Sequence, residues 1–238
     1  MSAHVYGKPV LSVSDFLLAQ AMSRIGGLPD PDPKNVGFLF DDLTEAATAN
    51  IPDGWVEQLI NTGATTLAVG TEGGGVSQLS TGVGASSNAN HTTKSPIIRA
   101  VGTVPWYFAG RMKITTAVTA QSTAATGLLD VAGTKTLYCG FIGGLSAVNF
   151  GFQYDGIGTG TFLNTGVAVD TNWHVFEIWG LGDGKLHAAF DFGADLGPVT
   201  MSAAPAGSVY IQRVITNGTD AVARTALHDY VACLYKRT

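Results

Sequence analysis

Apolar and polar side chains alternate along much of this chain, most clearly in residues 173–193, which read WHVFEIWGLGDGKLHAAFDFG. Two runs with a period of two residues flank a Gly-Asp-Gly turn, which predicts an antiparallel β-hairpin. The first run is mainly apolar on both faces, with Trp173, Val175, Glu177 and Trp179 on one and His174, Phe176 and Ile178 on the other. Because a strand with two apolar faces needs cover on both, we expect it to lie between two layers.

The second run of the hairpin has only one apolar face. Its core side would carry Leu186, Ala188, Phe190 and Phe192, and its other side Lys185, His187 and Asp191. A fully buried strand beside a half-buried one predicts a sandwich of two sheets. Similar runs recur at residues 106–115, 136–144, 148–156, 208–216 and 225–236. Spacing of about 8–12 residues predicts roughly ten to fourteen strands in an all-β domain over residues 36–238.

Residues 1–35 follow a different pattern. Ser14 and Asp15 can cap a short helix, and its apolar side would carry Phe16, Leu17, Ala21 and Ile25. Gly26-Gly27 would end this helix, and the LPDPDPK that follows should be extended, because proline fixes φ and disfavours helix in the preceding residue. We predict a short helical and extended N-terminal arm over residues 1–35. Its apolar side packs either on its own sandwich or on another subunit, and the sequence leaves both open.

Composition agrees with an all-β chain and limits the partners. The 238 residues include 31 glycines, and only 13% are charged, which fits many tight turns and few long helices. The net charge is −5 and the Lys and Arg residues are scattered, so we expect no nucleic-acid partner. No apolar run approaches the about 20 residues of a membrane span, and the N-terminus does not have the pattern of a signal peptide. We expect synthesis in a cytosol and no membrane partner.

Cys139 and Cys233 both fall in strand-like runs. We expect two small buried side chains. A disulfide would require the two strands to be neighbours, which the sequence does not decide. No spacing of His and Cys supports a metal site.

The hairpin and the C-terminal strands resemble a known fold. The run from Asp170 to Ile178, DTNWHVFEI, followed by a turn and LHAAFD, resembles the central hairpin of concanavalin A-like jelly rolls, a group that includes legume-lectin and laminin-G-like sandwiches. Residues 209–211, Arg224 and residues 227–231 are similar to the closing strands of lectin-like domains in bacteriophage structural proteins. The resemblance implies a two-sheet antiparallel jelly-roll sandwich. Phe192 separates Asp191 from Gly193 where many members have Asp-Gly, and we expect a bulge there.

The chain does not show the residue patterns of an enzyme of this fold. Glycoside hydrolases with this sandwich carry paired carboxylates on one strand, whereas Glu177 stands alone and is expected to be solvated or hydrogen-bonded. The five histidines are well separated, and His174 should be a strand histidine without a catalytic partner. The Gly73-Gly74-Gly75 run lacks the Lys and helix of a phosphate loop. We predict no catalytic residue and no metal ligand.

Binding is the remaining chemistry that the sequence offers. The candidates for stacking on sugars are Trp106, Tyr107, Tyr154 and Trp179. Aromatic residues of strands usually supply buried core area, so the core is the favoured place for each of the four. Lectins of this fold often bind calcium, and here it could use Asp155-Gly156, Asp170-Thr171-Asn172 or Asp220, although none forms a dense ligand loop. We otherwise expect no cofactor.

The sequence therefore suggests a non-enzymatic structural protein of a bacteriophage particle. Our first hypothesis is a capsid decoration or auxiliary head protein in the virion, anchored by the apolar residues of the arm to the major capsid protein or to tail components. A homo-oligomer such as a trimer would strengthen that attachment. The alternatives are a tail or fibre component, or a lectin-like adhesion module that binds a surface glycan.

Overall fold

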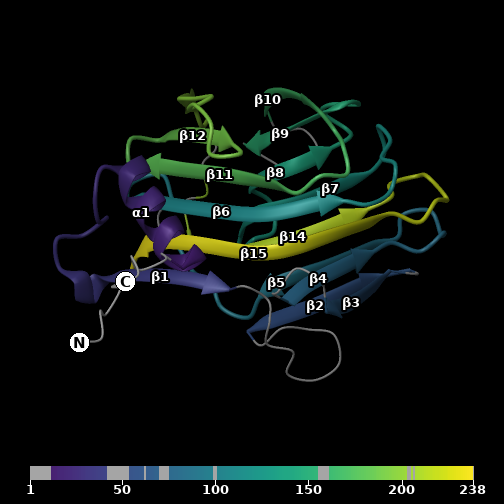
Figure 1. Cartoon of the computed structure of the whole chain (residues 1–238), viewed down its shortest axis with the longest axis horizontal. Coiled ribbons are helices and arrows are strands. Elements are labelled where there is room, and N and C mark those ends of the chain that lie inside the picture. Colours follow the sequence, from purple (N-terminus) through teal and green to yellow (C-terminus); the bar gives the residue numbers. More distant parts are fainter. Residues whose placement is uncertain are drawn as a thin grey trace, which may run out of the picture.

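The computed structural model describes residues 12–41, 54–61, 63–69, 75–98, 101–154, 161–202, 205 and 207–237. These residues form two antiparallel β-sheets packed face to face, with one helix on the outside (Figure 1). The predicted all-β, two-sheet jelly-roll sandwich with a short N-terminal helix is thus confirmed. The described residues contain fifteen strands, one more than the upper end of the predicted range.

The first sheet has eight strands in the order β13-β12-β11-β6-β15-β4-β3, and β1 also pairs with β15. Its members are β1 (Val36–Asp41), β3 (Ala64–Val69), β4 (Gly75–Ser80), β6 (Pro105–Ile114), β11 (His174–Leu181), β12 (Lys185–Phe190), β13 (Val199–Thr200) and β15 (Thr225–Lys236). The long strand β15 pairs with β4 through its first residues and with β1 through its last ones. It therefore joins both β4 and β1 to the central strand β6.

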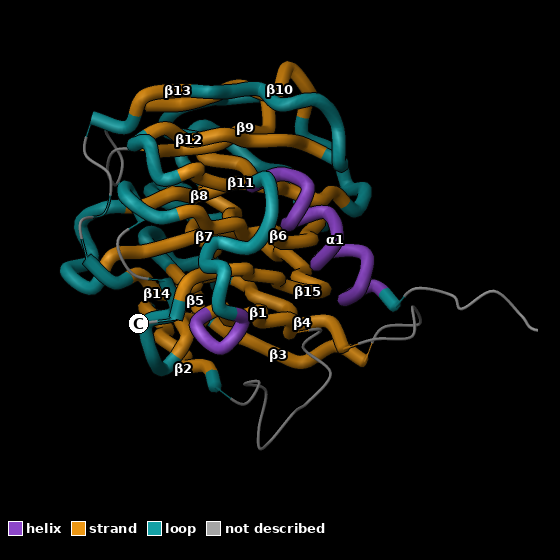
Figure 2. The backbone as a smooth tube through the Cα atoms, turned by 90° about the vertical axis from the view of Figure 1, so that its left-hand side faces the viewer, coloured by secondary structure: helices purple, strands orange, loops and turns teal. Residues whose placement is uncertain are grey.

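The second sheet has seven strands in the order β10-β9-β8-β7-β14-β5-β2. Its members are β2 (Trp55–Ile60), β5 (Asn88–Thr93), β7 (Thr123–Asp130), β8 (Thr136–Ile142), β9 (Asn149–Tyr154), β10 (Thr161–Ala168) and β14 (Val209–Thr216). Figure 2 shows β14, β5 and β2 on one side of the molecule and β15, β4 and α1 on the other. The consecutive strands β7, β8, β9 and β10 form a meander, and β14 returns beside β7.

The main core lies between the two sheets and is rich in aromatic side chains. Its largest fully buried members are Trp106, Phe108, Phe141, Phe150, Phe152 and Phe176. Cys139 of β8 and Cys233 of β15 belong to the same core as free thiols, and burial raises the pKa of both thiols. The two cysteines are buried small side chains, as predicted.

Helix α1 (Val13–Ile25) begins two residues earlier than the sequence suggests. Its N-cap is Ser12, whose backbone is extended, and Ser12 and Asp15 form a capping box. Ser14 is therefore inside the helix. The helix ends as predicted at Gly26, which has the left-handed φ of +74° that glycine tolerates. A 3₁₀ turn, η1 (Pro33–Asn35), then leads into β1.

The structure places α1 on its own sandwich, which was one of the two arrangements left open. The helix lies on the outer face of the first sheet, beside β6, β11 and β15 (Figures 1 and 2). The arm residues Leu17, Ala21 and Ile25 are buried there in a second apolar cluster. Phe16 is 44% exposed and meets Phe192 edge to face, with ring centroids 5.1 Å apart. This helix explains why both faces of β11 are apolar, since the second sheet covers one face and α1 the other.

Phe192 corrects the predicted register of the hairpin. Strand β12 ends at Phe190, and Asp191 and Phe192 both have left-handed backbones with φ of 49° and 58°. A hydrogen bond from Gly193 N–H to the Phe190 carbonyl closes the turn. The chain reverses instead of continuing as a bulged strand, so Phe192 packs on the outer cluster under α1 and not in the core.

One buried ion pair fastens α1 to the sheet. Glu177 of β11 is fully buried, accepts a hydrogen bond from Arg24 Nη2 at 2.9 Å and another from the Tyr107 hydroxyl at 2.8 Å. The Arg24 guanidinium also donates to the Gly193 carbonyl and lies 4.8 Å from the Trp179 ring centre. Of the two states expected for Glu177, the hydrogen-bonded one is present.

Replacing Arg24 should weaken the packing of α1 on the first sheet. Arg24→Met leaves the Glu177 carboxylate buried without its cation, which should lower the free energy of unfolding by about 3–5 kcal/mol. The double variant Arg24→Met, Glu177→Gln should recover most of that loss, because a neutral amide replaces the buried charge. Urea denaturation followed by tryptophan fluorescence measures both.

The matched control is Lys34→Met on the exposed surface of η1, which should change stability by less than about 0.5 kcal/mol. A loss below about 1 kcal/mol for Arg24→Met, or no recovery in the double variant, would contradict the importance given to this pair.

Candidate functional site

The outer face of the second sheet carries a groove of about 420 Å³. It lies over β5, β14, β7, β8 and β9, on the side of the molecule opposite α1. Five amide side chains line it: Asn88, Asn90, Gln121, Gln153 and Gln212. The other principal lining side chains are the hydroxyl-bearing Thr123, Tyr138 and Thr216 and the apolar Leu129, Ile142, Leu145 and Val214.

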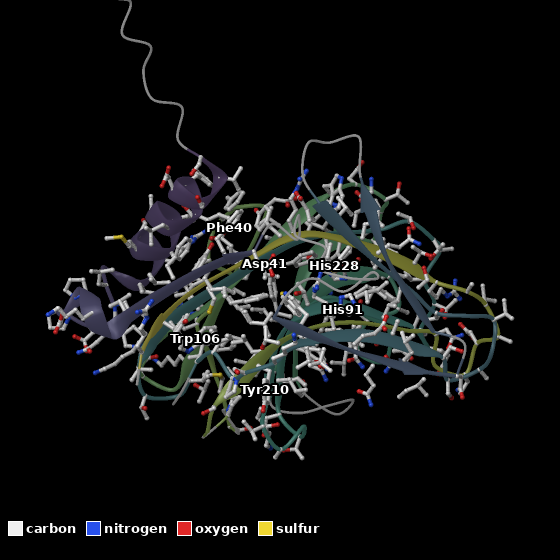
Figure 3. The ribbon with its side chains drawn as sticks, turned by 90° about the horizontal axis from the view of Figure 1, so that it is seen from below. Phe40, Asp41, His91, Trp106, Tyr210 and His228 are labelled. Carbon is white, nitrogen blue, oxygen red and sulfur yellow. The ribbon has the colours of Figure 1, made fainter. Side chains whose placement is uncertain are left out.

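Strand alternation determines which side chains reach this groove. In β14, Gln212, Val214 and Thr216 face the groove, while Arg213 and the isoleucines beside it face the core. Figure 3 places Tyr210, another outward residue of β14, on the outside of the second sheet and Trp106 between the layers. The available sequence signal was a pair of polar residues at alternate positions of one strand, Gln212 and Thr216. They were not among the binding residues predicted from the sequence.

Hydrogen bonds within the groove hold its amides in place. The Tyr138 hydroxyl donates to Gln212 Oε1, and Gln212 Nε2 donates to Thr92 Oγ1 at 3.0 Å. Tyr138 can reach Gln212 across β7 because Gly127, which pairs with both residues, has no side chain. Asn90 Nδ2 lies 3.3 Å from Gln58 Oε1 on the next strand. Asn90 and Gln212 are thus oriented before a ligand arrives.

An apolar patch lies beside these amides. Ala125, Tyr138, Ile142 and Val214 form a buried cluster, with Leu145 packed against it. A sugar ring has apolar C–H faces and hydroxyls at its edge, so an apolar patch ringed by donors and acceptors suits it. Because Asn90, Gln153 and Gln212 are largely shielded from water, their hydrogen bonds to a ligand would be stronger than on an open surface.

The four aromatic residues singled out in the sequence lie elsewhere. Trp106 and Tyr154 are buried between the sheets, and Trp106 donates its N–H to the Val101 carbonyl. Tyr107 and Trp179 are buried under α1. None of the four rings lies on the groove. Two of them belong to the core between the sheets and the other two to the cluster under α1.

The carboxylates considered for calcium are occupied by groups of the protein. Asp170 accepts from Asn172 and lies 2.9 Å from His174 Nε2. Asp220 accepts from Thr119 and Arg224, and residues 155 and 156 lie outside the described part of the chain. No group of three or more His, Cys, Asp or Glu side chains placed to hold a metal occurs among the described residues.

His174 has two partners, contrary to the expectation from sequence. Its Nδ1 lies 2.7 Å from Asp191 Oδ2, and its Nε2 lies 2.9 Å from Asp170 Oδ1. Burial alone would lower the pKa of this imidazole, but hydrogen bonds and attraction to the two carboxylates outweigh it and raise the pKa. His174 therefore fastens the loop before β11 to the turn after β12.

Two other histidines also combine, although the sequence separates them widely. His91 of β5 and His228 of β15 lie next to each other between the sheets (Figure 3), together with the buried Arg213 of β14. Arg213 Nη2 lies 3.1 Å from His91 Nδ1, and its guanidinium stacks 4.1 Å from the Trp55 ring centre. Trp55 in turn donates its N–H to Asp41 at 2.6 Å. His91, His228 and Arg213 are buried in the core, whereas Asp41 and Trp55 also line a cavity of about 240 Å³.

The hydrogen bond from Arg213 requires a neutral His91, since an imidazolium has no lone pair at Nδ1. Burial, and secondly the charge of Arg213, lower the pKa of His91 to about 3. Burial lowers the pKa of His228 as well, and the nearby Arg213 and His91 lower it further. Burial lowers the pKa of Arg213 to about 9, and Asp41 opposes that shift.

Comparisons with known proteins place the fold but not a family. No family model and no curated protein matches the chain. Among solved structures, a protein of unknown function from Shewanella oneidensis MR-1 has a TM-score of 0.61 at 12% identity, over 97% of both chains. A carbohydrate esterase of Shiga toxin-encoding bacteriophage phi24B has a TM-score of 0.58 at 16% identity, over 84% of this chain and 99% of that one.

A further similar structure is the CBM2 module of the evolved Dit protein of Lactobacillus casei BL23 phage J-1. Its TM-score is 0.56 at 12% identity, over 86% of this chain and 97% of that one. The fold is therefore that of the concanavalin A-like jelly-roll sandwiches, as the hairpin suggested. Among the described residues, no helix is long and apolar enough to cross a membrane.

Two kinds of histidine should give the stability of this protein opposite pH dependences. Below the ordinary pKa of 6.5, unfolded His91 and His228 bind protons that the folded chain does not, so the free energy of unfolding should fall as the pH falls toward about 4. His91→Gln keeps an acceptor for Arg213 and should reduce that fall by up to about 1.4 kcal/mol per pH unit.

His174 has a raised pKa, so its contribution is present below 6.5 and is lost as the pH rises through the folded value. His174→Gln should therefore cost more stability at pH 5.5 than at pH 8.5. Urea titrations of both variants at several pH values provide the measurement. The same pH slope in His91→Gln and the parent chain would disprove the account of the core cluster.

Proposed function

We propose that this chain is a carbohydrate-binding module whose ligand site is the groove on the outer face of the second sheet. The observation that carries the proposal is the set of five amides that line the groove beside an apolar patch, with Asn90 and Gln212 held by hydrogen bonds. Amides offer both donors and acceptors, as sugar hydroxyls do. Two of the similar structures are a phage carbohydrate esterase and a phage CBM2 module, which supports a glycan as the ligand class.

Binding without turnover is the simpler proposal for this groove. Similar folds occur in enzymes as well, such as a glycosyl hydrolase family protein of Mycobacterium fortuitum, so the fold alone does not decide. Glycoside hydrolysis of the usual kind needs two carboxyl groups facing the sugar, and the described lining of the groove supplies amides and hydroxyls instead. We therefore assign the groove a binding role.

Gln212→Ala should weaken binding to a polysaccharide by about tenfold, because it removes one or two hydrogen bonds worth about 1 kcal/mol each. Affinity electrophoresis against a panel of soluble polysaccharides measures it. Gln78→Ala, a half-buried glutamine on β4 of the other sheet, is the matched control and should bind like the parent chain. If no polysaccharide in the panel binds, or if Gln212→Ala binds as tightly as the parent, the proposal is wrong.

We further propose that the module is a structural component of a bacteriophage particle. A capsid decoration protein is the first choice, and a tail or fibre component is the second. Two observations favour it: similar structures come from phages, and Val13, Phe16 and Met22 remain exposed on α1 after Leu17, Ala21 and Ile25 are buried. The arm of residues 1–35 would then attach through this outer side to neighbouring virion proteins, in a trimer or another oligomer.

Mass spectrometry of purified virus particles induced from cells that carry the gene tests this placement. The chain should be present in stoichiometric amounts, and Val13→Ser with Met22→Ser should reduce its occupancy without lowering its melting temperature. Val83→Ser with Val222→Ser, at exposed positions away from α1, is the control. Particles that lack the chain altogether would refute the placement.

A further inference from the structure

The charge of the groove is its most distinctive chemical property. None of the described side chains that line it is acidic, basic or a histidine. Its polar groups are amides and hydroxyls from β5, β7, β8, β9, β14 and the loops beside them. An anionic ligand in such a shielded site would lose its hydration without gaining a cation.

The sheet does contain a cation at this position, but on its other face. Arg213 stands between Gln212 and Val214 in β14, and alternation turns it into the core, where it is fully buried. Two other cations of the described chain, Arg111 and Lys113, lie on the first sheet around the Trp173 ring. Because Arg213 faces the core, β14 contributes no positively charged side chain to the lining of the groove.

Gln212 keeps bonding capacity after it binds its neighbours in the sheet. Gln212 uses one amide hydrogen toward Thr92 and one lone pair toward Tyr138, and so retains a second hydrogen and a second lone pair. A sugar hydroxyl can donate and accept, so it can bond to both the free hydrogen and the free lone pair of Gln212. A carboxylate or sulfate only accepts and would face the Gln212 carbonyl with like partial charge.

We infer that the groove takes an uncharged glycan, and that it discriminates against uronic acids, sialic acids and sulfated sugars. This inference rests on the proposed carbohydrate-binding function and adds the class of ligand to it. Recognition depends on neutral hydrogen bonds and apolar contact, so binding should be nearly independent of ionic strength.

The experiment uses pairs of polysaccharides that share a backbone and differ in charge. Hydroxyethyl cellulose is compared with carboxymethyl cellulose, and dextran with dextran sulfate, within a panel that also holds neutral mannan and xylan and acidic alginate and polygalacturonate. The full chain should bind its best neutral polysaccharide at least about tenfold more tightly than any acidic one. Between about 0.05 and 0.5 M NaCl that affinity should change by less than about twofold.

A charge-insertion variant provides the specific readout. Gln212→Lys should reduce binding of the neutral ligand and create salt-sensitive binding of an acidic member of the panel, whereas Gln78→Lys on the other sheet should do neither. Circular dichroism and thermal melts confirm that both variants fold. If Gln212→Lys does not fold, Thr123→Lys at the half-buried rim of the groove serves the same purpose.

The outcomes separate the two claims. Preference for neutral polysaccharides with little salt dependence supports the inference. An acidic polysaccharide that binds the parent chain as well as any neutral one overturns the inference and leaves the binding function in place. Binding of nothing in the panel overturns the proposed function and the inference with it.

Discussion

Beneath α1, strands β6, β11 and β15 of the first sheet are apolar on both faces, and the rest of the molecule is arranged around that requirement. The second sheet covers the inner face through the aromatic core, and α1 covers much of the outer face. Once the helix is placed there, a carboxylate on that face is sealed from water, and Glu177 needs the cation and the hydroxyl that Arg24 and Tyr107 bring. The helix is thus bound by both apolar contact and charge.

The second sheet is in the opposite situation, since only its inner face is apolar. Its outer face carries amides, hydroxyls and a small apolar cluster, and in the described part of the chain no element covers it as α1 covers the first sheet. The two faces also differ in charge. Cations of the first sheet surround Trp173 on its outer side, whereas the cation of β14 points inward and forms the core cluster with His91 and His228. The groove is neutral for that reason.

Local pattern was a reliable guide to the sandwich. The hairpin, both apolar faces of β11, the end of α1 at Gly26 and the buried cysteines all follow from alternation, turn residues and side-chain size. Pattern was a poor guide to the partners of polar residues. Glu177 meets Arg24 across 153 positions, and Arg213 meets His91 across 122, and no spacing rule connects residues so far apart. Pattern also did not show which layer would cover each aromatic candidate, because a strand tryptophan looks alike whether its ring faces solvent, the core or a helix.

The sequence by itself determined the period of each segment, and with it the fold class, the hairpin and the side chains that share a face, because these depend on backbone geometry within a few residues. It did not determine which face meets which layer. Only the tertiary structure decided that α1 closes one outer face and leaves the other as a groove, that Phe192 turns outward, and that Gln212 reaches Tyr138 over Gly127. Those outcomes depend on contacts between strands far apart in the chain, whose order in the sheets is set by the packing of the whole core.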